Sequence, residues 1–277
     1  MIEPLFHLGP ISIHFFGVMI AVGALIGVGL LVHEAKKANV EKDLLLDGVF
    51  YSLLGGILGA RVIFVFVYNP GYYLERPLEI LFINQGGLSI HGGIIGGLLT
   101  GYIYLKKKKL SVWNTLDLVA PSLILAQGIS RIGCDVFGFA APDWWPIKIE
   151  NNGEMVHPAQ AYEFTLNYIL FGYLWLKLQA PRYTGEVFLH YLFGFMLIRG
   201  IVEFSRVNPQ VIGGLSVSHV MSLIGMAIAV YFIVKKKGQH KGEFPVPISS
   251  NREKWKVAVT VAILLILSLL LYFNVQG

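Results

Sequence analysis

Four arginines lie within or at the edge of long apolar segments, where charged side chains are costly and usually mark a functional site. Each offers a planar fork of donors that matches the oxygens of a phosphate. We therefore predict a pocket for an anionic headgroup. For each arginine the alternative is an ion pair with an acid that locks two helices together. The four residues are Arg61, Arg131, Arg199 and Arg206.

One segment, RGIVEFSR at residues 199–206, carries two of these arginines together with an acid. Arg199, Glu203 and Arg206 lie at positions i, i+4 and i+7, which predicts that all three share one face of a helix. A carboxylate between two guanidiniums can orient both forks and still leave net positive charge for an anion. A buried structural triad is the alternative.

Two other stretches add polar groups at the ends of apolar segments. In GISRIGCDVFG, Arg131 precedes Gly133, and glycines allow the chain to turn and a ligand to come close. In HPAQAYEF, Tyr162 precedes Glu163, which enters the membrane. Because a lone carboxylate is costly in lipid, we expect Glu163 to meet one of the arginines.

Histidine and cysteine are sparse in this chain. His91 stands alone among glycines and aliphatic residues in GGLSIHGGIIGG. It could be a general base or hydrogen-bond donor near the arginines, or a packed residue bonded to a carbonyl at the start of a helix. The eight histidines show no paired spacing, so no metal site is predicted. The single cysteine, Cys134, excludes an internal disulfide, and we expect a small buried residue there rather than a nucleophile.

The elements that must position these residues are membrane helices. The chain of 277 residues is 55% hydrophobic and 14% charged, with a mean hydropathy of +0.63, which is more apolar than a soluble domain requires. Runs of about 18 or more apolar residues recur, each long enough to cross a bilayer as a helix. We predict an all-α, polytopic integral membrane helical bundle with about eight transmembrane helices. The predicted spans are 11–33, 46–68, 88–105, 113–130, 160–179, 186–206, 215–234 and 256–274.

The basic residues indicate the orientation of the bundle. With the N-terminus outside, most of the 22 lysines and arginines fall in inside loops, whereas the outside loops keep only Arg76 and Lys148. The net charge of +5 is therefore a topology signal and gives no reason to expect nucleic acid as a partner. Two aromatic-rich outside loops, 69–86 and 132–158, are predicted either to cover an outward-facing site or to anchor at the membrane interface.

Small residues and a polar linker indicate how the chain is organised. Gly55 and Gly59 in one span, and Gly93 and Gly97 in the next, recur at four-residue spacing, which predicts that these two helices touch. No charged residue follows Lys256, so the last span is expected to be an anchor outside the site. The predicted parts are a seven-span core at 1–236, a cytoplasmic linker at 237–255 and an additional C-terminal transmembrane helix at 256–277.

Seven motifs, in order along residues 1–236, resemble those of the bacterial prolipoprotein diacylglyceryl transferases. They are FHLGPISIHFFGVMIAVG, GARVIFVFVYNP, GGLSIHGGIIGG, LDLVAPSLILAQGISRIG, HPAQAYEF, RGIVEFSR and LSVSHVMSL. The resemblance implies a multi-pass transferase of the bacterial plasma (inner) membrane, without a cofactor, whose active site faces the outer leaflet. The implied substrates are the membrane lipid phosphatidylglycerol and the signal peptide of a prolipoprotein, with its lipobox cysteine.

The resemblance also implies roles for individual residues. The diacylglyceryl group would move to the cysteine thiol and glycerol phosphate would leave, with His91, Arg131 and Arg199 as the catalytic residues. We expect the arginines to hold the phosphate and neutralise charge on the leaving oxygen, and His91 to assist deprotonation of the thiol or to orient the lipid. The substrate-binding residues implied by the family pattern are Arg61, Gly92, Gly93, Gly133, Tyr162, Glu163, Glu203, Arg206 and His219.

The chain also departs from the family pattern. Cys134 and Phe137 stand where two asparagines are expected, Phe16 replaces a tyrosine and His219 replaces a glutamine. Two other functions therefore stay open: a transporter or scramblase that moves an anionic lipid without a thiol acceptor, and a membrane protein that binds phosphatidylglycerol without turnover. The sequence lacks a pair of broken helices in corresponding halves, which disfavours the transporter.

Overall fold

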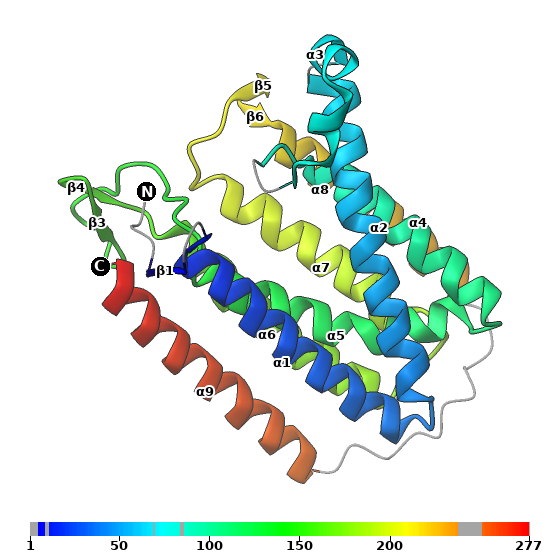
Figure 1. The fold of residues 1–277 in the computed structure, drawn as a ribbon. Helices are drawn as coiled ribbons and strands as arrows, with labels where there is room; N and C mark the ends of the chain where they lie inside the picture. The colour runs from blue at the N-terminus through cyan, green and yellow to red at the C-terminus, as the bar shows by residue number, and fades with distance from the viewer. Residues whose placement is uncertain (1–4, 9–10, 69, 84–85, 238–250, 277) are drawn as a thin grey trace. The chain divides into compact units, whose positions relative to one another are not determined.

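The long helices of this protein confirm the prediction of an all-α bundle. The computed structural model describes residues 5–8, 11–68, 70–83, 86–237 and 251–276. Figure 1 shows long helices joined by short helices, hairpins and loops. In the described residues the long helices are α1 (Phe15–Lys37), α2 (Lys42–Tyr68), α4 (Ile90–Lys107), α5 (Val112–Arg131), α6 (Ala159–Leu178), α7 (Glu186–Glu203), α8 (Val217–Lys236) and α9 (Asn251–Gln276).

Each predicted span corresponds to one of these helices, with differences at the ends. The first prediction is wrong at its start, because Ile11–Ile13 form strand β2, which pairs antiparallel with β1 (Phe6–Leu8), and α1 begins only at Phe15. At the other end of the chain, α9 begins at Asn251, earlier than the predicted residue 256. Most of the predicted linker, residues 238–250, lies outside the described residues.

Four of the described helices are long and apolar enough, by length and composition, to cross a membrane: α1, α2, α8 and α9. The other long helices, α4 to α7, carry closely packed glycines or buried polar side chains. Buried acids occur in α5, α6 and α7, at Asp117, Glu163 and Glu203. Buried charged side chains also occur in two of the more apolar helices, at Glu34 of α1 and Arg61 of α2, so both sets of helices carry polar groups inside the protein.

The described chain divides into two compact units, and each is considered by itself. The smaller unit, Val32–Thr115, contains α2 and α4, which lie side by side. An added Cβ at Gly59 would lie 2.5 Å from the carbonyl oxygen of Gly92, so only glycine permits this approach. The predicted contact between these two helices is confirmed. Between them the chain forms α3 (Pro70–Glu75) and the short 3₁₀-helix η1 (Pro77–Leu81).

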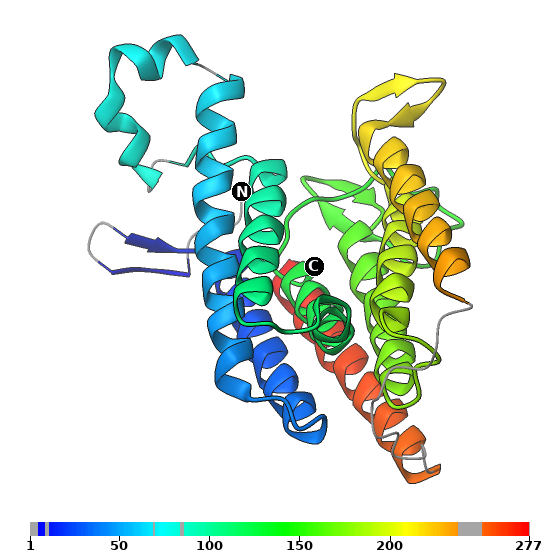
Figure 2. The same cartoon turned by 90° about the vertical axis from the view of Figure 1, so that its right-hand side faces the viewer.

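The larger unit, residues 1–31 and 116–277, contains helices α5 to α9 and most of α1. Its core is centred on Phe164, Tyr168 and Phe171 of α6, all fully buried, with Ile124 of α5 and Val187 of α7 packed around them. In Figure 2, α9 (red) runs beside the green helices of this unit, and it contacts α6. The larger unit therefore holds a continuous apolar core, against which the polar groups of α5, α6 and α7 are fixed.

A buried acid fixes the start of α7, and two short hairpins complete the larger unit. Asp117 of α5, which is fully buried, accepts hydrogen bonds from the backbone N–H groups of Gly185 and Phe188 at 2.6 and 2.8 Å. These are N-terminal donors of α7 that have no partner within the helix. The hairpins pair β3 (Ile149–Asn151) with β4 (Glu154–Val156) and β5 (Gln210–Ile212) with β6 (Leu215–Ser216).

Candidate active site

Glu163 is the centre of a cluster of arginines in the larger unit. Its side chain, on α6, is 1% exposed, and its Oε1 accepts a hydrogen bond from Arg131 Nε at 2.9 Å. Its other oxygen, Oε2, lies 4.0 Å from Arg199 Nη1 and 3.8 Å from Arg206 Nη1. The expectation that Glu163 meets an arginine is confirmed. Its carboxylate contacts the guanidiniums of three arginines.

Glu203 is the second carboxylate of the cluster. Its Oε2 lies 2.7 Å from Arg199 Nη2 and 3.8 Å from Arg206 Nε. Its Oε1 accepts hydrogen bonds from Ser216 Oγ at 2.5 Å and from Asn208 Nδ2 at 2.7 Å. Three guanidiniums therefore surround two carboxylates, and the cluster keeps one formal positive charge. This excess suits an anion of charge −1, such as a phosphodiester.

Arg206 belongs to the cluster, but it lies after the end of α7 and not on that helix as predicted. α7 ends at Glu203, and the N–H of Ser205 bonds back to the carbonyl of Val202 in a tight turn. Arg206 then pairs in an antiparallel bridge with Gly138. The prediction that Arg206 shares one helix face with Arg199 and Glu203 is therefore wrong, because the helix stops before the third position.

Two buried donors in the cluster face a carboxylate at 3.8–4.0 Å, which is too long for a hydrogen bond. Within the described residues, Arg199 Nη1 and Arg206 Nε form no hydrogen bond. A buried donor without an acceptor costs about 1–3 kcal/mol. The two atoms themselves are buried, whereas the side chains of Arg131, Arg199 and Arg206 as a whole are 30%, 19% and 13% exposed. Other parts of these guanidiniums are therefore accessible, and a phosphate, with several oxygens, matches guanidinium donors.

Cys134 lies next to Arg131, and its thiol is buried. Its Sγ accepts from Arg131 Nη1 at 3.5 Å, and its S–H points to the carbonyl of Ser130 at 3.8 Å. Burial raises the pKa of the Cys134 thiol although Arg131 is close. The thiol therefore stays protonated, and the expectation of a small buried residue is confirmed.

Tyr162 connects the loop 132–158 to α6. Its hydroxyl donates to the carbonyl of Ile147 at 3.1 Å, accepts from Trp145 Nε1 at 2.7 Å and lies 3.1 Å from His157 Nδ1. Gly138 of the same loop donates its N–H to the carbonyl of His157 at 2.9 Å. This loop is therefore folded and held by hydrogen bonds, and Tyr162 is one of its fixing points.

His219 and Gly133 have structural partners in the larger unit. His219 Nδ1 accepts from the backbone N–H of Ser216 at 3.2 Å, which caps α8, while Nε2 is buried and has no hydrogen-bond partner in the described chain. At Gly133, an added Cβ would lie 2.8 Å from the Cα of Phe16, so the residue permits α1 to approach. The predicted roles of both in substrate binding are untested by these contacts.

The remaining predicted site residues belong to the smaller unit. His91 is the second residue of α4 and is exposed, so the alternative of a packed histidine is wrong. Gly92 is buried, and a Cβ there would collide with the carbonyl oxygen of Gly59. At Gly93, an added Cβ would lie 3.7 Å from the Cβ of Ala60 in α2, which is ordinary van der Waals contact. These two glycines therefore form the contact between α2 and α4.

Arg61 has its donors occupied by the chain itself. Its side chain is buried at 6% exposure and donates from Nε, Nη1 and Nη2. The distances to the four closest carbonyl oxygens are between 2.6 and 3.0 Å. Because these carbonyls belong to the segment after α3, Arg61 fixes the path of the chain from η1 to α4. The accepting residues are Glu79, Ile80, Gly86 and Gly87.

Comparison with known proteins identifies the family. The family model for prolipoprotein diacylglyceryl transferase matches residues 3–235. The chain belongs to this family. Three similar proteins are named phosphatidylglycerol–prolipoprotein diacylglyceryl transferase. The protein from Bacillus cytotoxicus is 32% identical over 84% of this chain and 92% of the relative. The protein from Bordetella avium is 36% identical over 78% of this chain and 88% of the relative, and the protein from Staphylococcus aureus is 36% identical over 85% of this chain and 90% of the relative.

Membership of the prolipoprotein diacylglyceryl transferase family makes the chain a transferase and a membrane protein of several spans. It does not assign roles to individual residues, and the departures at Cys134 and Phe137 remain features of this chain. The family match ends at residue 235, so α9 lies outside it.

Sequence reasoning missed the polar residues that fix Glu203 and Arg199. Ser216 and Asn208 bond to Glu203, and Arg199 Nη2 donates to Ser218 Oγ at 3.1 Å. A signal was present in LSVSHVMSL, where Ser216 and Ser218 interrupt an apolar run next to His219. Serines at the start of a membrane helix are commonly caps, so the pattern does not by itself indicate a bond to an ion cluster.

Proposed function

We propose that this protein transfers the diacylglyceryl group of phosphatidylglycerol to the thiol of a prolipoprotein cysteine. The names of the relatives support the reaction. The observation that carries the proposal is the cluster of Arg131, Arg199 and Arg206 around Glu163 and Glu203, which keeps one formal positive charge. A lipid phosphate of charge −1 suits this excess of positive charge.

The reaction is a displacement at carbon. The thiolate sulfur of the acceptor peptide attacks the carbon of the acylated glycerol that carries the phosphate. A C–S bond forms there, and the bond between that carbon and the phosphate oxygen breaks. The electron pair stays on the phosphate oxygen, and glycerol phosphate leaves. Arginines aimed at that oxygen lower the barrier, because they stabilise charge that develops only in the transition state. The two substrates supply nucleophile and leaving group, so no cofactor is needed.

Roles follow for the residues of the site. Arg131 and Arg199 hold the phosphate and neutralise the leaving oxygen, Arg206 adds to the positive field, and Glu163 and Glu203 orient the three guanidiniums. The thiol proton needs an acceptor, and the exposed imidazole of His91 in the first turn of α4 can supply one or orient the lipid.

Several residues are better explained as positioning groups than as ligands of the substrate. Arg61 fixes the segment before α4 through backbone carbonyls, and Tyr162 fixes the loop 132–158. Gly92 and Gly93 bring α4 against α2, and Gly133 brings α1 against the turn after α5. We propose that these residues act on catalysis only through the geometry that they maintain.

The location and the acceptor complete the proposal. The basic residues favour an N-terminus outside and loops such as 106–109 inside, in the plasma membrane of a bacterium. The site then faces the outer leaflet, where the signal peptide of an exported prolipoprotein presents its lipobox cysteine. We place the transferase core in residues 1–236, with α9 as an additional helix after the linker.

A transfer assay tests the proposal. Purified protein is mixed with phosphatidylglycerol and a lipobox peptide, and mass spectrometry follows the peptide. We expect a mass gain equal to one diacylglyceryl group and release of glycerol phosphate. A peptide with serine in place of the cysteine is the control and should stay unmodified.

Failure of the assay would take one of two forms. Phosphatidylglycerol bound without any modified peptide would contradict the proposal and support a lipid-binding protein. Movement of the lipid between leaflets of a vesicle, with the peptide unmodified, would contradict it and support a scramblase. A known family member assayed in parallel shows that the conditions permit transfer.

A further inference from the structure

The last helix presents three polar side chains to the rest of the larger unit. Ser268, Tyr272 and Gln276 lie at i, i+4 and i+8 of α9, which places them on one face of an otherwise apolar helix. Ser268 and Tyr272 are buried. All three form hydrogen bonds outside α9. A membrane anchor needs no such bonds, since lipid demands only apolar surface.

Two of these bonds lead to the turn that carries Arg131. Tyr272 donates its hydroxyl to Gln160 Oε1 at 3.1 Å, and Gln160 Nε2 donates to the carbonyl of Cys134 at 3.1 Å. Gln276 Nε2 donates to the carbonyl of Ile132 at 2.9 Å. α9 therefore reaches the chain immediately after Arg131, directly at Ile132 and through one side chain at Cys134.

The turn after Arg131 depends on partners of this kind. α5 ends at Arg131, and the N–H groups of Ile132, Gly133 and Cys134 bond back to residues three positions earlier. The carbonyls at the end of a helix have no partner within it, and buried backbone groups must be paired. Because lipid supplies no hydrogen bonds, Gln160 and Gln276 hold the carbonyls that would otherwise be free.

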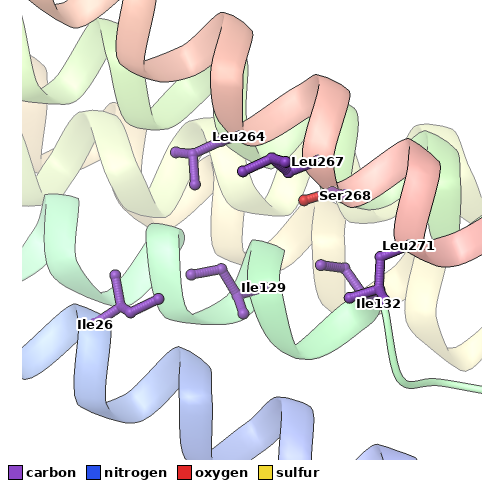
Figure 3. Close-up of a pocket in the computed structure, with 7 residues that line it drawn as sticks. All are labelled: Ile26, Ile129, Ile132, Leu264, Leu267, Ser268 and Leu271. Atoms are coloured by element: carbon purple, nitrogen blue, oxygen red, sulfur yellow. The ribbon is translucent and has the colours of Figure 1, made fainter.

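The third bond and the apolar surroundings fix α9 in place. The hydroxyls of Ser268 and Tyr168 lie 2.9 Å apart, and the ring of Tyr168 covers Gly128 of α5. An open pocket of about 130 Å³ lies between α1, α5 and α9. Of the residues that line it, Ser268 alone is polar (Figure 3). The apolar lining offers water few hydrogen-bond partners, so water is a poor substitute for the donors of α9.

We propose that α9 is a positioning element of the transferase site, and that Tyr272 and Gln276 fix the turn at 132–134 and thereby the direction of the Arg131 guanidinium. The inference rests on the proposed function, because its effect is read as a transfer rate. It extends the site beyond the family match, which ends before α9.

The expected effect is on turnover more than on lipid binding. A displacement of about 1 Å in a catalytic group can lower the rate roughly a hundredfold. Loss of two hydrogen bonds allows a smaller movement, so we expect kcat to fall about tenfold in a variant that lacks both. Arg199 and Arg206 still contact Glu163 and Glu203 in that variant, so KM for phosphatidylglycerol should change less than about threefold.

The experiment uses the full chain in vesicles that contain phosphatidylglycerol. The variants are Tyr272→Phe, Gln276→Leu and the two combined, and Asn274→Leu is the matched control. Asn274 is a polar, exposed residue of α9 whose amide donates to the carbonyl of Leu270 within the same helix. The control should keep the wild-type kcat, whereas the combined variant should lose about tenfold.

A double-mutant cycle separates positioning from a loss of folding. If Tyr272 acts through Gln160, adding Tyr272→Phe to Gln160→Leu should lower kcat no further. Wild-type kcat in the combined variant, or independent effects in the cycle, would overturn the inference while leaving the proposed function intact. An inactive wild-type protein would instead contradict the proposed function.

Discussion

At the scale of single residues, the carboxylates of the candidate site hold the arginines. Glu163 and Glu203 use their four oxygens on Arg131, Arg199, Arg206 and nearby polar groups. A buried ion pair contributes little net stability, since desolvation offsets the attraction. Its value here is orientation, because a guanidinium fixed on one edge presents its remaining donors in a defined direction.

Cys134→Ala tests whether the thiol beside Arg131 takes part in the reaction. The thiol is buried and its pKa is raised by that burial, so little thiolate forms at neutral pH. We expect the transfer rate to stay within about threefold of wild type, since only one weak contact is lost. The measurement is the rate of peptide modification by mass spectrometry. An inactive, correctly folded variant would show that Cys134 is a reacting group.

Residue types and spacing predicted the members of the cluster but not all of its geometry. That Glu163 meets an arginine followed from the cost of a lone acid in lipid. The approach of Arg206 could not be predicted in the same way, because it depends on where α7 ends and on a bridge to Gly138, far away in the sequence. Arg61 was expected at a phosphate and instead binds backbone carbonyls, whose positions depend on the path of a loop.

At the scale of elements, the contact between α2 and α4 depends on glycine. Gly92→Ala should destabilise the protein, because the new methyl group would collide with the carbonyl of Gly59. Overpacking of this kind costs about 1–3 kcal/mol, and we expect a lower thermal midpoint in detergent. The matched control is Gly29→Ala in α1, where an added Cβ meets no atom within 4 Å. Equal midpoints for the two variants would contradict this account of the contact.

Asp117→Ala tests the cap that α5 supplies to α7. The change removes the acceptor of two backbone N–H groups at the start of α7. Loss of a cap costs about 1–2 kcal/mol, and chemical denaturation should show a fall of that size in the free energy of unfolding. Asp143→Ala is the control, since Asp143 is fully exposed and its ion pair with Lys148 is long, at 3.9 Å. A smaller loss for Asp117→Ala than for this control would refute the cap.

Hydropathy located the helices well because lipid imposes a simple rule: each span needs a run of apolar residues long enough to cross. The same rule gave no information about short strands, and β2 was therefore predicted as part of the first helix. By the same rule, the apolar sequence of α9 predicted a membrane anchor outside the site. The spacing of Ser268, Tyr272 and Gln276 carried a signal for polar contacts, but their partners lie more than a hundred positions earlier for Tyr272 and Gln276.

At the scale of the whole molecule, the charge distribution predicts which loops face outward. Single cysteines introduced in a Cys134→Ala background test it with a maleimide that does not cross membranes. Asp143→Cys should react in intact cells, because the loop 132–158 is expected outside. Lys107→Cys should react only after the membrane is opened, since the end of α4 and the basic segment after it are predicted to lie inside. The reverse pattern would invert the predicted orientation and place the site toward the cytoplasm.

The central claim is that the arginines bind a phosphate through pairs of hydrogen bonds from each guanidinium, and not through charge alone. Its most direct test is the rate of transfer from phosphatidylglycerol to a lipobox peptide in Arg131→Lys and Arg199→Lys, beside the control Arg182→Lys in an exposed loop. Lysine keeps the charge but lacks the fork, and loss of one donor to a developing oxyanion lowers kcat by about a hundredfold or more. The account predicts losses of about that size for Arg131→Lys and Arg199→Lys, with the control near wild type. Near-normal rates in both would contradict it.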